Sequence, residues 1–221
     1  MDIFRKHEQF EMLVLDELNS ARILPGLIFG GGTMLRLCHG LDRYSVDLDF
    51  YLIKSDYAGG LLEKCVNALG NRYVITDQAD KRNTVLIELS SEQYPRRLKI
   101  EINKTSAIRT WKKEIAWSPY STVQVLVNAV TLAEFAQMKT EALIDRKEIR
   151  DAYDLEFLLK KKITIAGDTG LFKKMVKVID GFGRHDYAVK LGSVIEQEKR
   201  QYYIDNQFRI LMDYLVARAK T

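Results

Sequence analysis

The hydrophobic positions of the chain follow two periods, and the change between them divides the sequence into a mixed first part and a helical second part. Residues 3–20 repeat apolar side chains at helical spacing and predict an amphipathic helix. After the break at Pro25-Gly26, apolar runs predict strands at 46–53, 84–89, 98–102 and 123–127, and helices are expected at 33–40 and 61–69. This alternation favours a sheet domain of the α/β or α+β class.

From Thr131 onward the pattern is helical. Thr131 and Glu134 form a T-x-x-E capping box, which predicts the start of a helix that continues through Leu143. A helix over 152–159 follows, either after a break near 145–147 or as a continuation of the first, and further helices are expected at 171–179, 187–195 and 202–217. We therefore expect a sheet domain at 1–128, which includes the N-terminal helix, and a helical domain at 129–221.

Composition adds little to this picture. Of the 221 residues, 47% are hydrophobic and 29% charged, a normal globular profile, and the net charge of +4 is compatible with a phosphate-bearing partner. The two cysteines and three histidines show no metal-binding spacing. Charges interrupt the N-terminal apolar residues, unlike the core of a signal peptide, so we expect a cytoplasmic protein without a membrane span.

The candidate chemistry lies in the predicted strand at 46–53. Asp47 and Asp49 alternate with apolar residues, so an extended strand places both carboxylates on one face, with Cα atoms about 6.5–7 Å apart. Two anions this close repel each other unless a cation lies between them. Mg²⁺ prefers carboxylate oxygens and keeps positions open for phosphates, which is the arrangement of metal-assisted phosphoryl or nucleotidyl transfer.

Two further features extend this site. The sequence RLKIEI places Glu101 on the polar face of the strand at 98–102, where it can supply a third carboxylate. Upstream, Gly30-Gly31-Gly32 opens a helix, whose first backbone N–H groups can face an anion. Taken singly, each feature also has an ordinary explanation: a solvated strand edge for the acidic pair, an exposed carboxylate for Glu101, and a tight turn for the glycines.

The combination resembles a known family. Gly31-Gly32, followed after residues 33–46 by Asp47-Leu48-Asp49-Phe50, is the signature of nucleotidyltransferases, and GGTMLRLCHGLDRYSVDLDF resembles the AbiEii/AbiGii toxins of type IV toxin–antitoxin and abortive-infection systems. A second block, KTEALIDRKEIRDAYDL at 139–155, resembles the K-x-x-A-x-x-x-R element of that family with its D-x-x-D. The resemblance covers about residues 28–158. It implies an α+β nucleotidyltransferase fold, in which helices flank a mixed sheet and a helical region follows.

The resemblance also implies roles for individual residues. The triphosphate would lie against Gly31, Gly32 and Thr33, and Ser45 would orient phosphate or the acidic strand. The metal ligands would be Asp47, Asp49 and Glu101, the last as ligand or as base.

Phosphate oxygens would be bound by Lys139 and Arg146, which a helix brings to the face of the small Ala142. The D-x-x-D pair would be Asp151 and Asp154. Without the resemblance, these four are as readily explained as solvated charges, the aspartates pairing with Arg150 or Lys147.

The sequence therefore predicts an Mg²⁺-dependent nucleotidyltransferase, with Mn²⁺ as the other metal considered. As a toxin it would transfer a nucleoside monophosphate from an NTP to an RNA hydroxyl, such as that of a tRNA, beside an antitoxin that forms no stable complex. One alternative is a protein or small-molecule acceptor, such as an antibiotic. Another is a nucleotide-binding module without catalytic activity.

Overall fold

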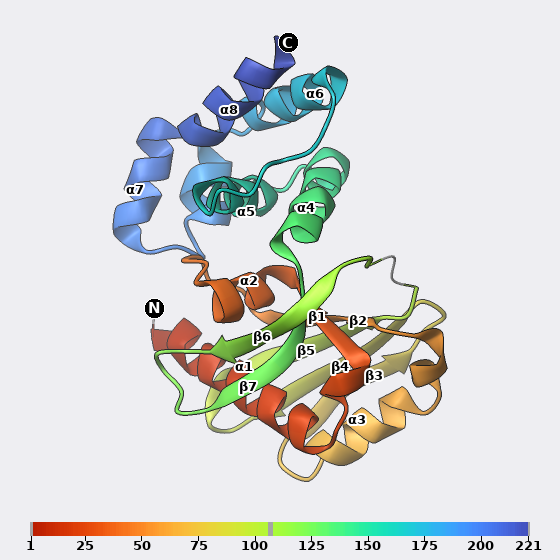
Figure 1. Cartoon of the computed structure of the whole chain (residues 1–221). Helices are drawn as coiled ribbons and strands as arrows, with labels where there is room; N and C mark the ends of the chain where they lie inside the picture. Colours follow the sequence, from red (N-terminus) through yellow and green to blue (C-terminus); the bar gives the residue numbers. More distant parts are fainter. Residues whose placement is uncertain (1, 106–107, 221) are drawn as a thin grey trace. The chain divides into compact units, whose positions relative to one another are not determined.

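The computed structural model describes residues 2–105 and 108–220, and the chain divides into two compact units at 1–130 and 131–221. The described residues leave out positions 1, 106, 107 and 221. These positions belong to the domains expected at 1–128 and 129–221. Each unit is considered by itself. The first contains the sheet and the second is helical (Figure 1).

The first unit is built on one seven-stranded sheet in the order β3-β4-β5-β2-β1-β7-β6. Its strands are β1 (Leu27–Gly30), β2 (Asp47–Leu52), β3 (Val74–Asp80), β4 (Thr84–Ser91), β5 (Tyr94–Asn103), β6 (Trp111–Trp117) and β7 (Gln124–Val130). The pairs β1/β7 and β2/β5 are parallel, and the remaining neighbours are antiparallel. The predicted α+β class with a mixed sheet is thus confirmed.

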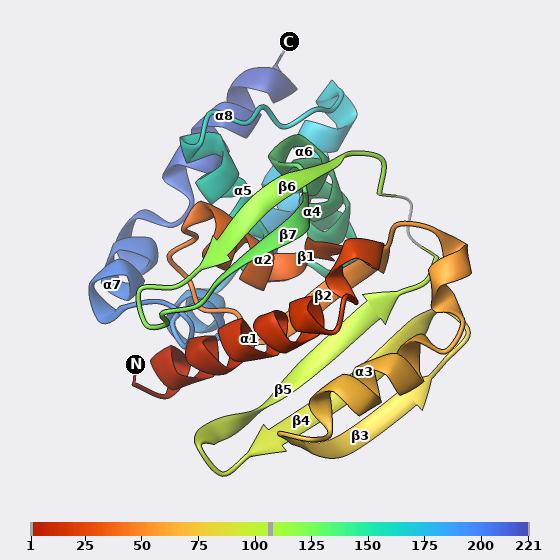
Figure 2. The same cartoon turned by 60° about the horizontal axis from the view of Figure 1, so that its bottom comes forward.

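Helices α1 (Asp2–Ser20) and α3 (Leu61–Leu69) pack on one face of this sheet (Figure 2). In the strands beneath them, every second residue is buried over the whole of β2, over 85–89 of β4 and over 98–102 of β5. Helix α2 (Gly31–His39) follows β1 directly and ends at Gly40, whose φ of 75° is the left-handed conformation of a helix C-cap. Short 3₁₀ turns at Leu24–Gly26 and Ser55–Ala58 complete the connections.

Strands β3 and β6 lack the alternation of buried and exposed residues. In β3 all seven residues are exposed or half-exposed, and β6 reads WKKEIAW with only Ala116 buried. Both strands form the outer edges of the sheet, where backbone pairing to a single neighbour holds them. Edge strands need no apolar face, so the polar stretch that the sequence analysis assigned to no element can still form β3.

The second unit contains α4 (Leu132–Arg146), α5 (Ile149–Lys160), α6 (Thr169–Asp180), a short π-helix at Asp186–Leu191, α7 (Gln197–Asn206) and α8 (Arg209–Ala219). The capping box is present, since the backbone N–H of Glu134 donates to Oγ1 of Thr131. Of the two alternatives for α4 and α5, the break is correct, because Lys147 has a φ of 53° and ends α4.

Two helix predictions for this unit are wrong. The region expected as a helix at 187–195 is a π-helix that ends at Leu191 and is followed by turns. The helix expected at 202–217 is two helices, because Gln207 adopts a φ of 51° between them. Residues other than glycine rarely adopt positive φ, so the glutamine at 207 does not itself predict this break.

Candidate active site

The two carboxylates of β2 lie on the face of the strand that α1 and α3 do not cover. Asp47 and Asp49 are half-exposed, whereas Leu48 and Phe50 are at most 1% exposed. The ring of Phe50 stacks on that of Phe29 in β1, with 5.1 Å between the ring centroids. Burial of the apolar side chains therefore fixes which way the carboxylates point, because a shift of one residue would exchange the two faces.

Strand β5 brings the third carboxylate beside this pair. In the parallel register of β2 and β5, Asp49 lies opposite Glu101 and Asp47 lies opposite Lys99. All four side chains are half-exposed and lie on the same face of the sheet. The three acidic residues that the sequence singled out therefore lie on two neighbouring strands of the first unit.

Lys99 is a member of this face to which the sequence analysis gave no role. Its Nζ lies 2.6 Å from Oε1 of Glu101. This hydrogen bond raises the pKa of Lys99, burial opposes the rise, and the charges of Glu101, Asp47 and Asp49 add to it. The ammonium group therefore offsets part of the repulsion among the three carboxylates.

The glycine triplet packs directly against the acidic strand. A Cβ on Gly31 would lie 2.0 Å from Oδ2 of Asp49, and the φ of Gly31 is +68°. A Cβ on Gly30 would meet the ring of Tyr51 at 2.6 Å, and one on Gly32 would meet Oγ of Ser45 at 2.8 Å. The missing side chains are therefore what lets the start of α2 approach β2 so closely.

Side chains from two helices hold the backbone at the start of β2. Oγ1 of Thr33 donates to the carbonyl of Asp47 at 2.7 Å, and Nε2 of His7 donates to the carbonyl of Val46 at 2.9 Å. Thr33 is fully buried, and its hydroxyl holds the strand instead of facing a nucleotide.

Behind this strand, α1 carries three buried polar residues that the sequence analysis missed: His7, Glu8 and Glu11. Glu8 pairs with Arg36 of α2 and accepts a hydrogen bond from Ser118. Burial, together with the nearby charge of Glu8, raises the pKa of Glu11 well above its usual value. The available signal was a polar residue at 7, 8 and 11 on the otherwise apolar face of a predicted helix.

The donor set suits a hard divalent cation, because all three candidate ligands are carboxylates with oxygen donors. Among residues 2–105 and 108–220, no three side chains of His, Cys, Asp or Glu are grouped closely enough to coordinate an ion. The Lys99 ammonium contacts Oε1 of Glu101, so this carboxylate would be shared between Lys99 and any ion that is held here. Asp47, Asp49 and Glu101 are therefore candidate ligands by the type and the shared face of their donors, and their side chains do not converge on one point in this structure.

In the helical unit, the second sequence block forms a buried ionic cluster. The ammonium of Lys139, only 8% exposed, lies 2.8 Å from Asp151 and 2.7 Å from Asp154. Nε and Nη2 of Arg146 each donate a hydrogen bond to the carboxylate of Asp151, both at 2.7 Å.

Burial raises the pKa of Asp151, but the hydrogen bond from Arg146 and the charge of Lys139 outweigh it and hold that pKa below its usual value. The carboxylates of Asp151 and Asp154 therefore hold the side chains of Lys139 and Arg146 in place. The alternative partners Arg150 and Lys147 make no ion pair with either aspartate in the described part of the chain.

A sequence model of one protein family, described as "Nucleotidyl transferase AbiEii toxin, Type IV TA system", matches residues 14–211. The chain belongs to the AbiEii nucleotidyltransferase toxin family. By membership of this family it is a nucleotidyltransferase enzyme, and the resemblance read from the glycine pair and the acidic strand is confirmed. A search of curated proteins gave no match.

Solved structures share the fold. JHP933 from Helicobacter pylori is 20% identical with a TM-score of 0.57, and the alignment covers 95% of each chain. A putative nucleotidyltransferase from H. pylori is 20% identical with a TM-score of 0.58, covering 96% of this chain and 95% of that one. MenT4, a nucleotidyltransferase toxin from Mycobacterium tuberculosis, is 16% identical with a TM-score of 0.53, covering 95% and 85%. At these identities the likeness extends to the fold alone.

No helix within the described ranges has both the length and the apolar character that crossing a bilayer requires.

We expect Gly31→Ala to lower nucleotidyl transfer by about 100-fold, the cost of moving a catalytic group by roughly 1 Å. The added methyl group collides with Oδ2 of Asp49 and pushes that carboxylate from its place. Gly40→Ala is the matched control. Its φ is also positive, at +75°, but nothing lies within 4 Å of the new Cβ. Both variants should lose about 1 kcal/mol of stability to the left-handed backbone. Transfer rates and urea unfolding separate the two effects, and full activity of Gly31→Ala would contradict the role of this contact.

Proposed function

We propose that this toxin transfers a nucleoside monophosphate from an NTP to a hydroxyl group of an RNA, in a reaction that depends on Mg²⁺, with Mn²⁺ able to replace it. The observation that carries the proposal is the acidic face of the first unit, where Asp47 and Asp49 of β2 lie beside Glu101 of β5 next to the glycine turn. Carboxylates on two neighbouring strands beside a glycine turn are suited to a divalent ion and a phosphate.

The divalent ion would be held by Asp47, Asp49 and Glu101, and it would neutralise phosphate charge and acidify the attacking hydroxyl. In the transfer, a bond forms between the acceptor oxygen and the α-phosphorus, and the bond from that phosphorus to pyrophosphate breaks. The acceptor proton leaves to Glu101 or to water. Lys99 would compensate charge on the same face before the substrate arrives.

We assign the triphosphate to the backbone of Gly31, Gly32 and Thr33, with Ser45 beside Gly32 orienting a phosphate or the strand. Backbone N–H groups at the start of α2 are suited to an anion.

The helical unit would contribute Lys139 and Arg146. An ammonium has three donors, and the two aspartates use two of those of Lys139, which leaves one for a phosphate oxygen. Arg146 has a side chain that is 58% exposed and keeps further N–H donors outside its contact with Asp151. Asp151 and Asp154 would act as supporting residues that keep both cations in place.

An RNA acceptor is favoured by the basic net charge of +4. The proposal is tested with purified protein, Mg²⁺ and each of the four α-labelled NTPs, incubated with tRNA and, separately, with total protein. We expect label in tRNA, none after EDTA treatment, and recovery when Mg²⁺ or Mn²⁺ is restored. Label in protein would replace the RNA acceptor by a protein acceptor, and incorporation into neither fraction would overturn the RNA and protein acceptors together.

As a member of a type IV toxin family, the chain should act in the cytoplasm beside a cognate antitoxin. We propose that this antitoxin counteracts the reaction without forming a stable complex with the toxin. Co-expression followed by size-exclusion chromatography tests this, and co-elution of the two proteins would contradict it.

A further inference from the structure

The helical unit contains a pocket that none of the proposed site residues lines. Its volume is about 590 Å³, within the range of small-molecule and nucleotide sites. The lining comes from the end of α4, from α6 and from the π-helix region: Ile144, Lys147, Lys174, Lys177, Val178, Gly181, Phe182, Asp186 and Lys190. We call it the lysine pocket.

The charge of the lysine pocket is strongly one-sided. Four lysines line it, against the single carboxylate of Asp186, which pairs with Lys190 at 2.9 Å. Lys147, Lys174 and Lys177 are exposed, and within 2–105 and 108–220 none of them forms an ion pair. Three unpaired ammonium groups around one hollow repel each other, and an anion with several charges would relieve that repulsion.

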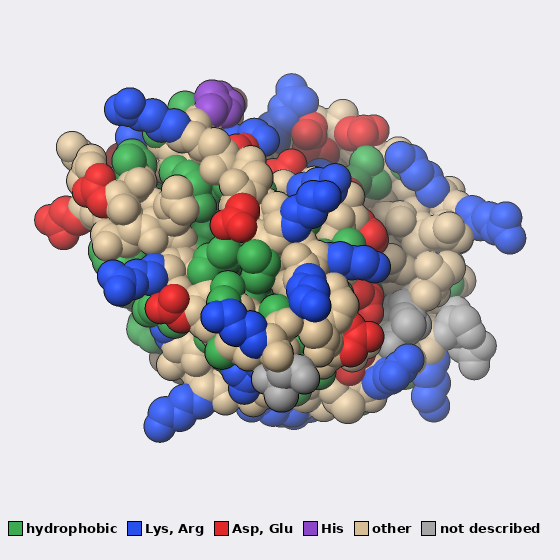
Figure 3. Space-filling view, turned by 90° about the horizontal axis from the view of Figure 1, so that it is seen from above, with side chains coloured by type: hydrophobic (Ala, Val, Ile, Leu, Met, Phe, Trp, Pro, Cys, Tyr) green, Lys and Arg blue, Asp and Glu red, His purple; other side chains and the backbone are tan. Residues whose placement is uncertain are grey.

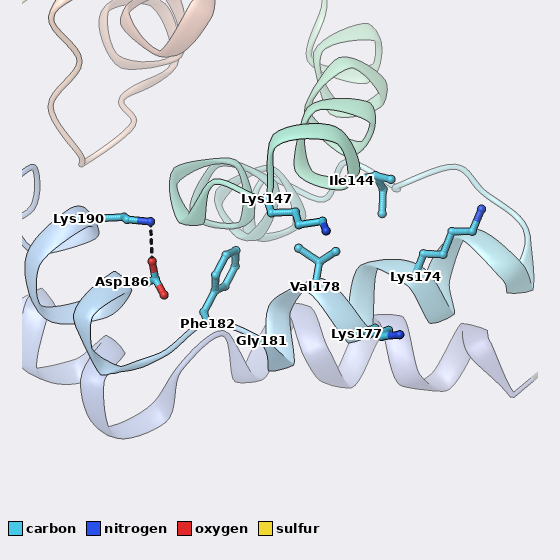
Figure 4. Close-up of a pocket in the computed structure, with 9 residues that line it drawn as sticks. All are labelled: Ile144, Lys147, Lys174, Lys177, Val178, Gly181, Phe182, Asp186 and Lys190. Carbon is cyan, nitrogen blue, oxygen red and sulfur yellow. Dashed lines mark ion pairs between the residues drawn. The ribbon is translucent and has the colours of Figure 1, made fainter.

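The interior of the lysine pocket is apolar. Phe182 and Val178 point into it from the side of α6, while Lys147 reaches over it from the end of α4 (Figure 4). Edge contacts with Tyr187 and Phe208, each at 6.5 Å between ring centroids, hold the ring of Phe182 in place. The pocket therefore offers an aromatic surface inside a rim of cations. Seen from above in Figure 3, the molecule has an exposed hydrophobic area bordered by Lys and Arg and also by Asp and Glu side chains.

We propose that the lysine pocket is an RNA-binding site of the helical unit, in which the lysines contact backbone phosphates and Phe182 packs against a base. Base stacking on aromatic rings combined with a positively charged groove is how proteins bind single-stranded nucleic acid without reading its sequence. The proposal rests on the proposed function, since it concerns the RNA acceptor of that reaction.

An RNA fits the lysine pocket better than an acidic protein segment does. Lysine binds phosphate as a point charge on a flexible stem, and the half-exposed ring of Phe182 in the lining can stack on a base, which an acidic protein segment lacks. Lys174 and Lys177 are three positions apart and so lie on one face of α6, which suits a ligand whose charges repeat along a chain.

Binding of a labelled single-stranded RNA, measured by fluorescence anisotropy without NTP or metal, tests the proposal. Lys174→Gln combined with Lys177→Gln should weaken binding by about tenfold and reduce the slope of log affinity against log salt by about 0.7 for each lysine removed. The matched control combines Lys64→Gln with Lys173→Gln, two exposed lysines outside the lysine pocket. It changes the net charge equally and should leave both quantities close to those of the wild type.

Equal RNA binding by the pocket variant and the control, or no RNA binding by the wild-type protein, would overturn the proposal. So would a pocket variant that loses binding of labelled NTP but binds RNA as the wild type does. The proposed function is judged separately, by nucleotide incorporation in wild type and Asp47→Asn. If no nucleotide is incorporated, RNA binding can still be measured. If the lysine pocket does not bind RNA, nucleotide incorporation can still be measured.

Discussion

Asp47→Asn should reduce nucleotide incorporation by more than about 100-fold. Replacing a residue that only supports a metal ligand typically costs 10- to 100-fold, so the loss of a direct ligand is expected to exceed that range. Asn keeps the shape of the side chain and removes its negative charge, so the strand should remain folded while affinity for the divalent ion falls. Incorporation of α-labelled NTP into tRNA, measured over a range of Mg²⁺ concentrations, gives the rate and the metal requirement together.

Asp77→Asn is the control for this result. Asp77 is an exposed residue of the edge strand β3 in the same unit, and its replacement makes the same chemical change. Transfer by Asp77→Asn should equal that of the wild type. If Asp47→Asn incorporates nucleotide at the wild-type rate, the acidic face of β2 is not the catalytic centre and the proposed mechanism fails.

Lys139→Met should lower the free energy of unfolding of the helical unit by about 3–5 kcal/mol, the usual cost of removing one partner from a buried ion pair. The carboxylate of Asp154 is fully buried and that of Asp151 is 1% exposed, so neither can turn to water for compensation. Urea unfolding at neutral pH measures the loss. Lys173→Met, at an exposed position of α6, should change stability by no more than about 0.5 kcal/mol.

Two further measurements identify the cause of this loss. Adding Asp154→Asn to Lys139→Met removes one stranded charge and should recover part of the stability. The folded-state pKa of Asp151 is lowered, so its stabilisation is complete above the ordinary pKa of an aspartate and disappears as the pH falls through the lowered value. The gap between wild type and Lys139→Met should therefore narrow in acid. A gap that is independent of pH, or no loss at neutral pH, would show that the cluster does not stabilise this unit.

Several structural features could be predicted because their cause is local. The alternation of Asp47, Leu48, Asp49 and Phe50 specifies a strand with a polar and an apolar face, and the structure has that strand. The capping box at Thr131 likewise depends only on residues within one turn of helix. Such features are carried by spacing alone.

Other features had no local cause. The edge strands β3 and β6 form through pairing to a neighbour, although their own side chains lack the apolar alternation. The break at Gln207 and the π-helix at Asp186–Leu191 depend on packing within the helical unit. The buried charges of α1 depend on partners such as Arg36, 28 positions from Glu8. In each case the deciding contact joins segments that are separate in the chain.

The sequence by itself determined the family, the acidic pair and its shared face, because glycine spacing and a period of two act over a few residues. It identified Glu101 as a third carboxylate and put Lys99 on the same face of that strand. Only the tertiary structure decided that this strand lies beside β2, with Glu101 opposite Asp49 and Lys99 opposite Asp47, since the order of strands sets which distant segments pair. It also decided that Lys139 is buried between two aspartates, because helix spacing fixes a face but not what covers it.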